Sequence, residues 1–368
     1  MFKPKYLITN KILKNVAVIE AAREMVDNAP LVPAWEAKFR EDALMRTVHF
    51  GTHVEGNDLT MAETERVVKQ DPQRDESAVD VAARAGVTAR ERDVQEVINY
   101  RNVMKYLDQL LAEMKGNSGR HYKLSDMLQI HALSTERMIP ADQVGVLRTA
   151  QVVIRGLVKG EIVSRPPLSV EVPYQVDDFF AWLNGTDAVE THPVIKSAIT
   201  HFELSRIHPF TEGNGRTARA MTLLILAREG IDAKRFFSIE EHFDKNIQEY
   251  YDAFVQVAKS EGEMTPWVEF FTQALAIEMN KVKEKVKRLS IDNRLRGTVG
   301  RQVSLSERQV NLVEYLESNE SLSMNEAREV LPMVSDDTIL RDLTDLMTKG
   351  VVKKVGKTKG AKYTLRGL

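Results

Sequence analysis

A run of twelve residues, from His208 to Arg219, brings together side chains that could bind a phosphate chain and move a proton. It contains a histidine, the carboxylate of Glu212 and a Gly-Asn-Gly turn. Arg216 and Arg219 are three residues apart, so both could reach one ligand from one face of a helix, and two guanidinium forks suit a polyphosphate. Histidine can accept a proton near neutral pH. The run therefore indicates a site that binds a nucleotide polyphosphate and deprotonates the group that attacks it.

The Gly-Asn-Gly turn of residues 213–215 is predicted to lie at the start of a helix over residues 214–227. Unpaired backbone N–H groups at a helix N-terminus carry the positive end of the helix dipole, and glycine lets a phosphate approach them closely. Glu212 lies beside this cradle and could hold Mg²⁺ (or Mn²⁺), which keeps most of its ligand shell as water and phosphate oxygen. We expect Phe210 to point into the core and to pin the loop.

Most of the first 290 or so residues are predicted to be helical, because apolar residues recur at helical spacing. Helices are expected over residues 12–26, 34–54, 93–111, 124–134, 176–183, 193–207, 214–227, 243–259 and 265–287. The polar segment Gln70–Arg92 contains Pro72 and is expected to be a loop. Between Leu147 and Pro173, two short β-branched runs interrupted by glycine predict a β-hairpin or an extended flap.

The segment Leu289–Val303 lacks helical periodicity and is predicted to hold a domain boundary. The pattern after it predicts three helices and two strands, which together make a winged helix-turn-helix. The segment Lys349–Leu368 is rich in lysine and free of acids, which suits contact with phosphate. The helix that would read bases, Ser335–Met347, is acidic, and acids repel a duplex. DNA binding therefore stays open but is not favoured, and docking of a target protein or self-association is at least as well supported.

Composition places the chain among soluble globular proteins, with 43% hydrophobic and 28% charged residues in 368. It has no cysteine, which excludes disulfides and Cys-ligated zinc and favours a reducing compartment. The N-terminus does not lead into an apolar signal core, and no apolar stretch is long enough to span a bilayer. The net charge of −2 does not indicate a polyanion partner. We expect a cytoplasmic protein without a membrane segment.

The run from His208 to Arg219 resembles the signature of the Fic family, His-x-Phe-x-(Asp/Glu)-Gly-Asn-Gly-Arg-x-x-Arg, at every fixed position. The resemblance extends over roughly Ala34–Ala276. It implies a mainly helical core with a β-hairpin flap, and transfer of AMP from ATP to a Ser, Thr or Tyr hydroxyl of a protein, with release of pyrophosphate. It also implies that His208 is the general base, that Glu212 is the Mg²⁺ ligand, and that the glycine amides and both arginines contact the phosphates.

The resemblance places four segments of the chain around the nucleotide. The flap at Ile154–Leu157 would align the target segment as an added strand. Tyr250 and Tyr251 match positions near the nucleoside, and packing on a helix face is an equally supported role for them. The residues expected to contact ATP are Glu55, Ile154, Arg155, Gly156, Leu157, Glu212, Gly213, Asn214, Gly215, Arg216, Thr217, Ala218, Arg219, Tyr250 and Tyr251.

The segment Thr52–Asn57 resembles the Fic inhibitory motif, (Ser/Thr)-x-x-x-Glu-(Gly/Asn), at Glu55 and the glycine after it. The hydroxyl position of that motif holds Gly51, and Thr52 stands one residue later. The resemblance implies that Glu55 pairs with Arg219 and holds ATP in an unreactive pose. The alternative is a surface acid, whose ion pair would contribute little. In related enzymes the same glutamate also supports removal of AMP, so the net direction stays open.

We expect three regions: residues 1–110 with an inhibitory helix at about 34–57, a Fic catalytic core at 111–287 and a winged-helix domain at 300–368. The expected partners are ATP, a target protein that the sequence does not identify, and a second copy of the chain. One alternative is a Fic relative that transfers phosphate, phosphocholine or UMP. Another is a DNA-binding regulator that only senses ATP. The complete catalytic set favours a transferase, because a sensor does not need the base His208.

Overall fold

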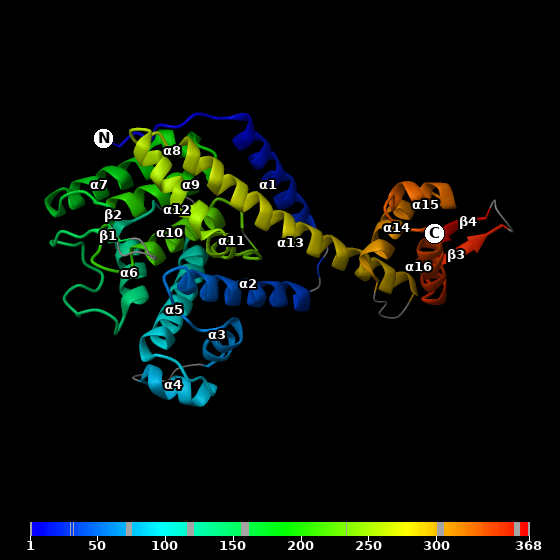
Figure 1. Ribbon diagram of the computed structural model, residues 1–368, viewed down its shortest axis with the longest axis horizontal. Coiled ribbons are helices and arrows are strands. Elements are labelled where there is room, and N and C mark those ends of the chain that lie inside the picture. Colours follow the sequence, from blue (N-terminus) through cyan, green and yellow to red (C-terminus); the bar gives the residue numbers. More distant parts are fainter. Residues whose placement is uncertain are drawn as a thin grey trace. The chain divides into compact units, whose positions relative to one another are not determined.

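The computed structural model describes residues 2–29, 31, 33–70, 76–115, 121–155, 162–232, 234–299, 305–356 and 361–366. This part of the chain is mainly helical, as predicted, and its strands form two small antiparallel hairpins (Figure 1). Two compact units are present. The first comprises Met1–Glu24 and Ala34–Asn280, and the second comprises Met25–Pro33 and Lys281–Leu368. No helix among the described residues is long and apolar enough to span a lipid bilayer.

Helices α1 to α13 build the first unit, and α1 and α13 continue into the second. Their bounds are α1 (Asn10–Asn28), α2 (Pro33–His53), α3 (Met61–Val68), α4 (Ala78–Ala85), α5 (Glu91–Lys115), α6 (Leu124–Thr135), α7 (Val172–Leu183), α8 (Thr186–Glu190), α9 (Pro193–Ile207), α10 (Asn214–Arg228), α11 (Glu240–Lys245), α12 (Ile247–Lys259) and α13 (Thr265–Val299), with a 3₁₀ turn η1 (Ser169–Glu171) before α7.

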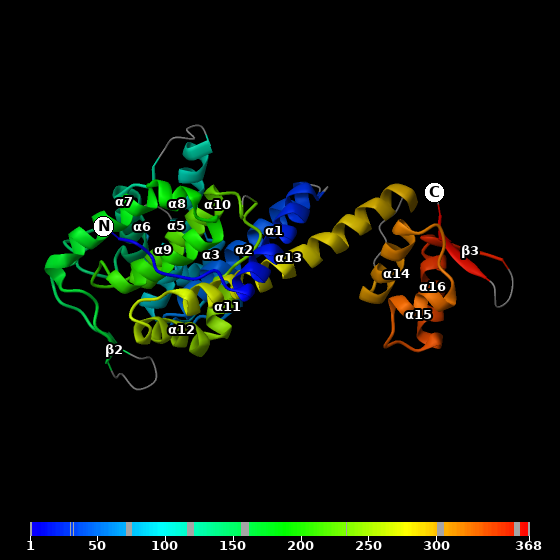
Figure 2. The same ribbon diagram turned by 90° about the horizontal axis from the view of Figure 1, so that it is seen from above.

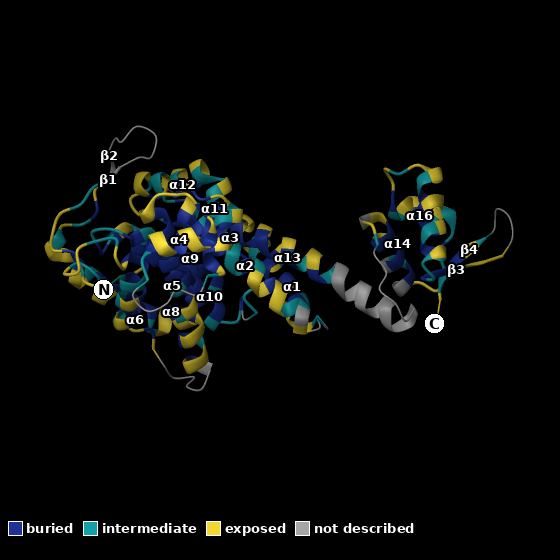
Figure 3. Ribbon diagram, turned by 90° about the horizontal axis from the view of Figure 1, so that it is seen from below, coloured by how far each residue is buried: buried dark blue, intermediate teal, exposed yellow. Residues whose placement is uncertain are grey.

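Helices α9 and α10 form the centre of the first unit (Figure 3). Residues 216–227 of α10 are all buried, and those after Arg219 are apolar or small on every side of the helix. Helix α10 packs against α9, α5 and α6. Trp267 of α13 is fully buried and packs on α9, where its indole N–H donates to the carbonyl of Ala198 at 2.7 Å. The loop that joins α9 to α10 therefore lies between the ends of two buried helices.

The predicted flap is present as strands β1 (Ile154–Arg155) and β2 (Ile162–Ser164), which pair antiparallel. In both views the hairpin lies at the periphery of the first unit (Figures 1 and 2). Residues 156–161 at its tip, and with them the predicted contacts Gly156 and Leu157, lie outside the described residues. The same holds for the side chain of Arg155.

Two predictions for the first unit were wrong: one helix was missed, and another is divided in two. The supposed loop 70–92 contains α4, which Ser77 caps by accepting a hydrogen bond from the N–H of Asp80, and which Gly86 ends with a φ of 62°. Eight residues are too few to show clear periodicity, although the helix has a buried face. The helix predicted over 243–259 is divided at Asn246, whose side chain donates to the carbonyl of His242. Such a local bond competes with the helix ladder.

Helix α13 also differs from the prediction, because it continues to Val299 through the expected boundary at 289–303. Once a helix is nucleated, each added residue gains a hydrogen bond at little entropic cost, and this stretch contains no proline to stop it. Weak amphipathic periodicity therefore did not mean the end of a helix here.

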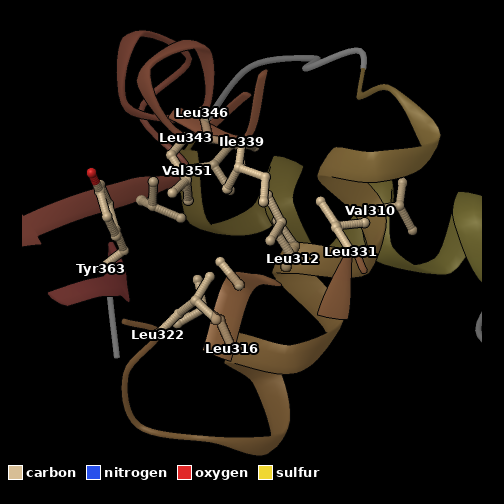
Figure 4. Packing of buried hydrophobic residues seen from close by; sticks show 13 residues of the cluster. Val310, Leu312, Leu316, Leu322, Leu331, Ile339, Leu343, Leu346, Val351 and Tyr363 are labelled. Carbon is tan, nitrogen blue, oxygen red and sulfur yellow. The ribbon is translucent and has the colours of Figure 1, made fainter. Parts of the chain in front are cut away.

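The second unit contains the predicted winged helix-turn-helix. Its elements are α14 (Glu307–Ser318), α15 (Met324–Val330), α16 (Asp336–Thr348), β3 (Val352–Val355) and β4 (Lys362–Leu365). The two strands pair antiparallel, and Leu322 adds a bridge to Tyr363. Ser306 and Ser323 begin α14 and α15 with complete capping boxes. A compact apolar core joins the three helices to the strands (Figure 4), and its fully buried members are Leu312, Val313, Leu322, Ala327, Ile339, Leu343 and Leu346.

Candidate active site

The loop between α9 and α10 is held in one shape by buried groups. Phe210 is fully buried, as predicted, and its ring stacks on His131 with the centroids 3.7 Å apart. The side chain of Asn214 accepts from the N–H of Phe210 and donates to its carbonyl, both at 2.9 Å. Gly213 has a φ of 74°, and a Cβ there would lie 2.6 Å from a methyl group of Thr135. Only glycine therefore fits at the start of α10.

His208 ends α9 in a left-handed conformation with a φ of 50°. Its Nδ1 lies 3.2 Å from the carbonyl of Ser205, and since a carbonyl only accepts, Nδ1 carries the proton. The lone pair of Nε2 is then available. Burial is the largest cause of a lowered pKa at His208, and Arg148 lowers this pKa further. Arg148 also fixes the position of the histidine, because its Nε donates to the carbonyl of His208 at 2.7 Å.

A cavity of about 940 Å³ lies along this loop. The volume lies within the range of nucleotide and cofactor sites. Of the residues expected to contact ATP, those that line the cavity are Glu55, Ile154, Glu212, Gly213, Asn214, Gly215, Arg219, Tyr250 and Tyr251. His208 lines it as well, and Phe202, Phe254, Val257 and Met264 supply an apolar wall. The side chains of Arg216, Thr217 and Ala218 are instead buried in α10.

Glu55 lies between the two arginines of the motif. Its Oε1 accepts from Nη2 of Arg219 at 2.6 Å, and its Oε2 is 2.9 Å from Nε of Arg216. Burial works to raise the pKa of Glu55, but the two guanidinium groups outweigh it and the pKa is lowered. At 24% exposure the side chain is not a solvated surface acid. Arg219 is also bonded to the carbonyl of Gly51 at 2.7 Å, so the end of α2 covers the guanidinium that faces the cavity.

The glycine at position 51 has a steric cause. A Cβ there would lie 2.4 Å from Cε1 of Tyr100, whose side chain is fully buried on α5. A serine or threonine at this position would therefore collide with α5. Thr52, one residue later, is buried, and its hydroxyl donates to the carbonyls of Val48 and His49 within α2.

The two arginines of the motif do not share a ligand-facing side. Arg216 is 1% exposed and points into the interior, where its Nη1 lies 2.9 Å from Oε1 of Glu96 and donates to the carbonyl of Ser134 at 3.0 Å. Helix α5 covers this face of α10, and so Arg219 alone among the two lines the cavity. Glu96 was not recognised in the sequence, because it is 120 residues from Arg216 and has no local spacing signal.

The carboxylate of Glu212 is placed where it could bind a metal ion. It lines the cavity beside the glycine amides. No group of three or more His, Asp or Glu side chains that could hold a metal occurs among the described residues. A single carboxylate beside an anion cradle suits Mg²⁺, which takes its other ligands from phosphate and water. In the structure this carboxylate is paired with Arg92 of α5, a second residue that the sequence did not indicate.

His131, to which the sequence assigned no role, supports the backbone of Glu212. Its Nδ1 accepts from the N–H of Gly145 at 3.0 Å, so its Nε2 carries the proton and donates to the carbonyl of Glu212 at 3.0 Å. Burial lowers the pKa of His131 to about 4, and the ring is neutral at pH 7. Among the tyrosines, Tyr250 both lines the cavity and packs in the core, where its hydroxyl bonds to His201 at 2.9 Å.

Comparisons with known proteins agree with this geometry. Residues 121–226 match the model of the Fic/DOC family, and residues 308–357 match that of the DeoR-like helix-turn-helix domain. The protein adenylyltransferase Fic of Culex quinquefasciatus is 25% identical over 252 residues, which are 68% of this chain and 44% of that protein. The corresponding protein of Aedes aegypti is 28% identical over 230 residues, or 62% and 40%. The chain thus spans less than half the length of these relatives.

Solved structures show the same fold. A Fic family protein from Desulfovibrio desulfuricans G20 aligns over 100% of this chain and 99% of its own, with a TM-score of 0.61 and 22% identity. Fic-1 from C. elegans aligns over 75% of this chain and 73% of its own, with a TM-score of 0.58 and 20% identity. Together, these comparisons show that residues 121–226, which include the loop between α9 and α10, are similar to the Fic/DOC family, that residues 308–357 are similar to the DeoR-like helix-turn-helix domain, and that the chain has the fold of these solved Fic structures.

Proposed function

We propose that this protein transfers AMP from ATP to a Ser, Thr or Tyr hydroxyl of a target protein and releases pyrophosphate. The observation that carries the proposal is that a histidine with a free Nε2 lines the same cavity as the Gly213–Gly215 turn and Arg219. A base and a phosphate cradle are thereby placed in one site. The relatives named protein adenylyltransferase Fic support the same reaction.

In the proposed reaction, Nε2 of His208 takes the proton of the target hydroxyl as its oxygen attacks the α-phosphorus of ATP. The bond from this phosphorus to the oxygen that bridges to the β-phosphorus breaks, and pyrophosphate leaves with the electron pair. The backbone N–H groups of residues 213–215 and the guanidinium of Arg219 hold the phosphates. Glu212 would hold Mg²⁺, which would neutralise charge on the phosphate oxygens.

The remaining walls of the cavity are proposed to bind the nucleoside and the target. Tyr250 and Tyr251 would flank the nucleoside, since both line the cavity next to its apolar wall. Ile154 of β1 lines the same cavity, so the edge of the hairpin could take up the target segment as an added strand. This mode uses backbone hydrogen bonds and tolerates varied target sequences.

Glu55 is proposed to restrain this reaction. Its Oε1 pairs with Nη2 of Arg219, the arginine of the motif that lines the cavity, at 2.6 Å. A phosphate could bind this guanidinium only after Glu55 has moved away. The structure therefore corresponds, under this proposal, to a restrained state. Whether the same carboxylate supports removal of AMP from a modified protein is a separate outcome, which the reverse reaction on a labelled target would reveal.

The proposal is tested with ATP labelled at the α-phosphate and, separately, at the γ-phosphate. The unmodified protein, Glu55→Gly and His208→Ala are incubated with Mg²⁺, and protein-bound label is measured, self-modification included. We expect α-label that increases in Glu55→Gly and is lost in His208→Ala. Label from the γ-phosphate alone would instead indicate a kinase-like relative. Absence of both labels, with lysate added as a source of targets, would refute AMP transfer and favour another donor or an ATP-sensing regulator.

A second function, DNA binding by the C-terminal domain, gains support from the ion pairs of α16. Three of the acids that were expected to repel a duplex are paired inside the domain: Asp336 with Arg328 at 2.6 Å, Asp342 with Arg308 at 2.7 Å, and Asp345 with Lys349 at 2.5 Å. Their charge is thus largely offset. Lys353 and Lys354 on β3 and Lys362 on β4 are exposed and suit phosphate contact. This function does not compete with AMP transfer.

A further inference from the structure

The carboxylate of Glu212 has a cationic partner outside the catalytic run. Nη2 of Arg92, in the first turn of α5, contacts Oε1 of Glu212. The two side chains are 58% and 36% exposed, so the pair lies where ions and ligands from solution can reach it. Arg92 is 120 residues away in the chain, and no step of the proposed reaction uses it.

The other contacts of Glu212 leave its side chain dependent on Arg92. His131 holds only the backbone carbonyl of Glu212. Nη2 of Arg216 is 4.0 Å from the same Oε1, but Arg216 is buried and already paired with Glu55 and Glu96, each at 2.9 Å. Arg92 is exposed and can move into solvent, whereas Arg216 cannot. Arg92 is therefore the partner that would be exchanged when Glu212 takes another cation.

We infer that Arg92 is a positioning residue: it holds the side chain of Glu212 at the cavity and competes with a divalent cation for that carboxylate. The inference rests on the proposed function, because it takes Glu212 as the ligand of the metal that accompanies ATP. A guanidinium and Mg²⁺ both require the carboxylate oxygens, so they exclude one another. Arg92 thus offsets the negative charge of Glu212 beside the phosphate cradle until metal and nucleotide bind together.

The test measures binding rather than turnover. In a Glu55→Gly background, where Arg219 is released, calorimetry gives the dissociation constant of an ATP analogue with a methylene group between its α- and β-phosphorus. The measurement is made in EDTA and again in excess Mg²⁺. Arg92→Gln should raise the ratio of the metal-free to the Mg²⁺ constant by about two- to fivefold, the size expected for an exposed ion pair. The metal-free constant should rise, because the unpaired carboxylate of Glu212 repels bare phosphate. The Mg²⁺ constant should fall, because this carboxylate binds Mg²⁺ more readily.

Arg90→Gln is the matched control. Arg90 is 62% exposed and two residues before Arg92, but its partners are Asp58 and Asp93. This variant loses the same charge and should leave the ratio unchanged. An unchanged or lower ratio in Arg92→Gln would overturn the inference, as would an equal increase in both variants, which would reflect net charge alone. If the parent binds no nucleotide at all, the proposed function fails and the inference fails with it. If the parent binds nucleotide but Arg92→Gln leaves the ratio unchanged, the inference alone fails.

Discussion

His208 has the features that a general base requires at the scale of a single residue. The ring is fixed by the bond from Nδ1 to the carbonyl of Ser205, and the opposite nitrogen is free. Burial lowers the pKa of His208 from its ordinary value of 6.5, and the neighbouring charge of Arg148 acts in the same direction. Only the neutral ring can accept a proton, so a lowered pKa keeps the base in its active form at neutral pH.

This reasoning predicts the pH dependence of AMP transfer by the Glu55→Gly variant. The rate should be flat near pH 7 and should fall as the pH decreases through the pKa of His208, below about 6.5, because the protonated ring cannot act as a base. In the same background His208→Ala should lower the rate by a factor of about 10² to 10⁴ while ATP still binds. His121→Ala, which changes an exposed histidine, serves as the control. A rate retained in His208→Ala would contradict the assignment.

Among the helices, α2 has its C-terminal end held over Arg219 by close contact with α5. Gly51 lets the backbone of α2 approach Tyr100, and this approach places both the carbonyl of Gly51 and the carboxylate of Glu55 on Arg219, at 2.7 and 2.6 Å. The glycine therefore has a packing role in the proposed restraint, and it stands at the hydroxyl position of the motif that the segment resembles.

Gly51→Ala tests this contact. The new methyl group would overlap the ring of Tyr100, so the free energy of unfolding should fall by about 1–3 kcal/mol, as for other overpacked sites. AMP transfer should increase, because α2 can no longer hold Glu55 on Arg219. Denaturant titration and α-label incorporation measure the two effects. In a Tyr100→Leu background the same change should cost less, and an equal cost in both backgrounds would show that the contact is unimportant.

In the molecule as a whole, a unit with a match to the Fic/DOC family and a winged helix-turn-helix occur in one chain. The ion pairs of α16 show that its acidic composition is not a measure of the charge it presents. The wing retains exposed lysines. DNA contact through the wing is therefore a function that can be tested directly with the full chain.

The full chain should bind a random-sequence DNA duplex at low salt, with an affinity that decreases as salt increases. Replacing both Lys353 and Lys354 by glutamate should weaken binding and reduce the slope of log affinity against log salt by about 2, since about 0.9 is lost for each phosphate contact. The double change Lys14→Glu and Lys38→Glu, at exposed lysines of the first unit, has the same charge and should have a smaller effect. Gel-shift titration measures both. No binding at low salt would exclude this function.

Much of the fold could be predicted because it depends on local pattern. Helix α9 has the predicted bounds, and the winged domain follows from short apolar runs and their serine caps. The prediction failed where local pattern is weak: α4 is too short to show periodicity, and α13 continues on helix propagation alone. For α4 the missing information is its packing partners, and for α13 it is the position at which helix propagation stops.

The loop at residues 208–219 and the candidate restraint at Glu55 could be recognised from the sequence alone. The parts of that loop lie within twelve residues, and their geometry follows from local rules: a glycine start, a helix dipole and a histidine at a helix end. The distribution of charge around the loop depends on contacts between distant segments. Tertiary packing buries Arg216 against Glu96, leaves Arg219 to face the cavity, and places Arg92 on Glu212. These partners come from α5, and ion pairs between distant segments depend on packing that no spacing in the sequence records.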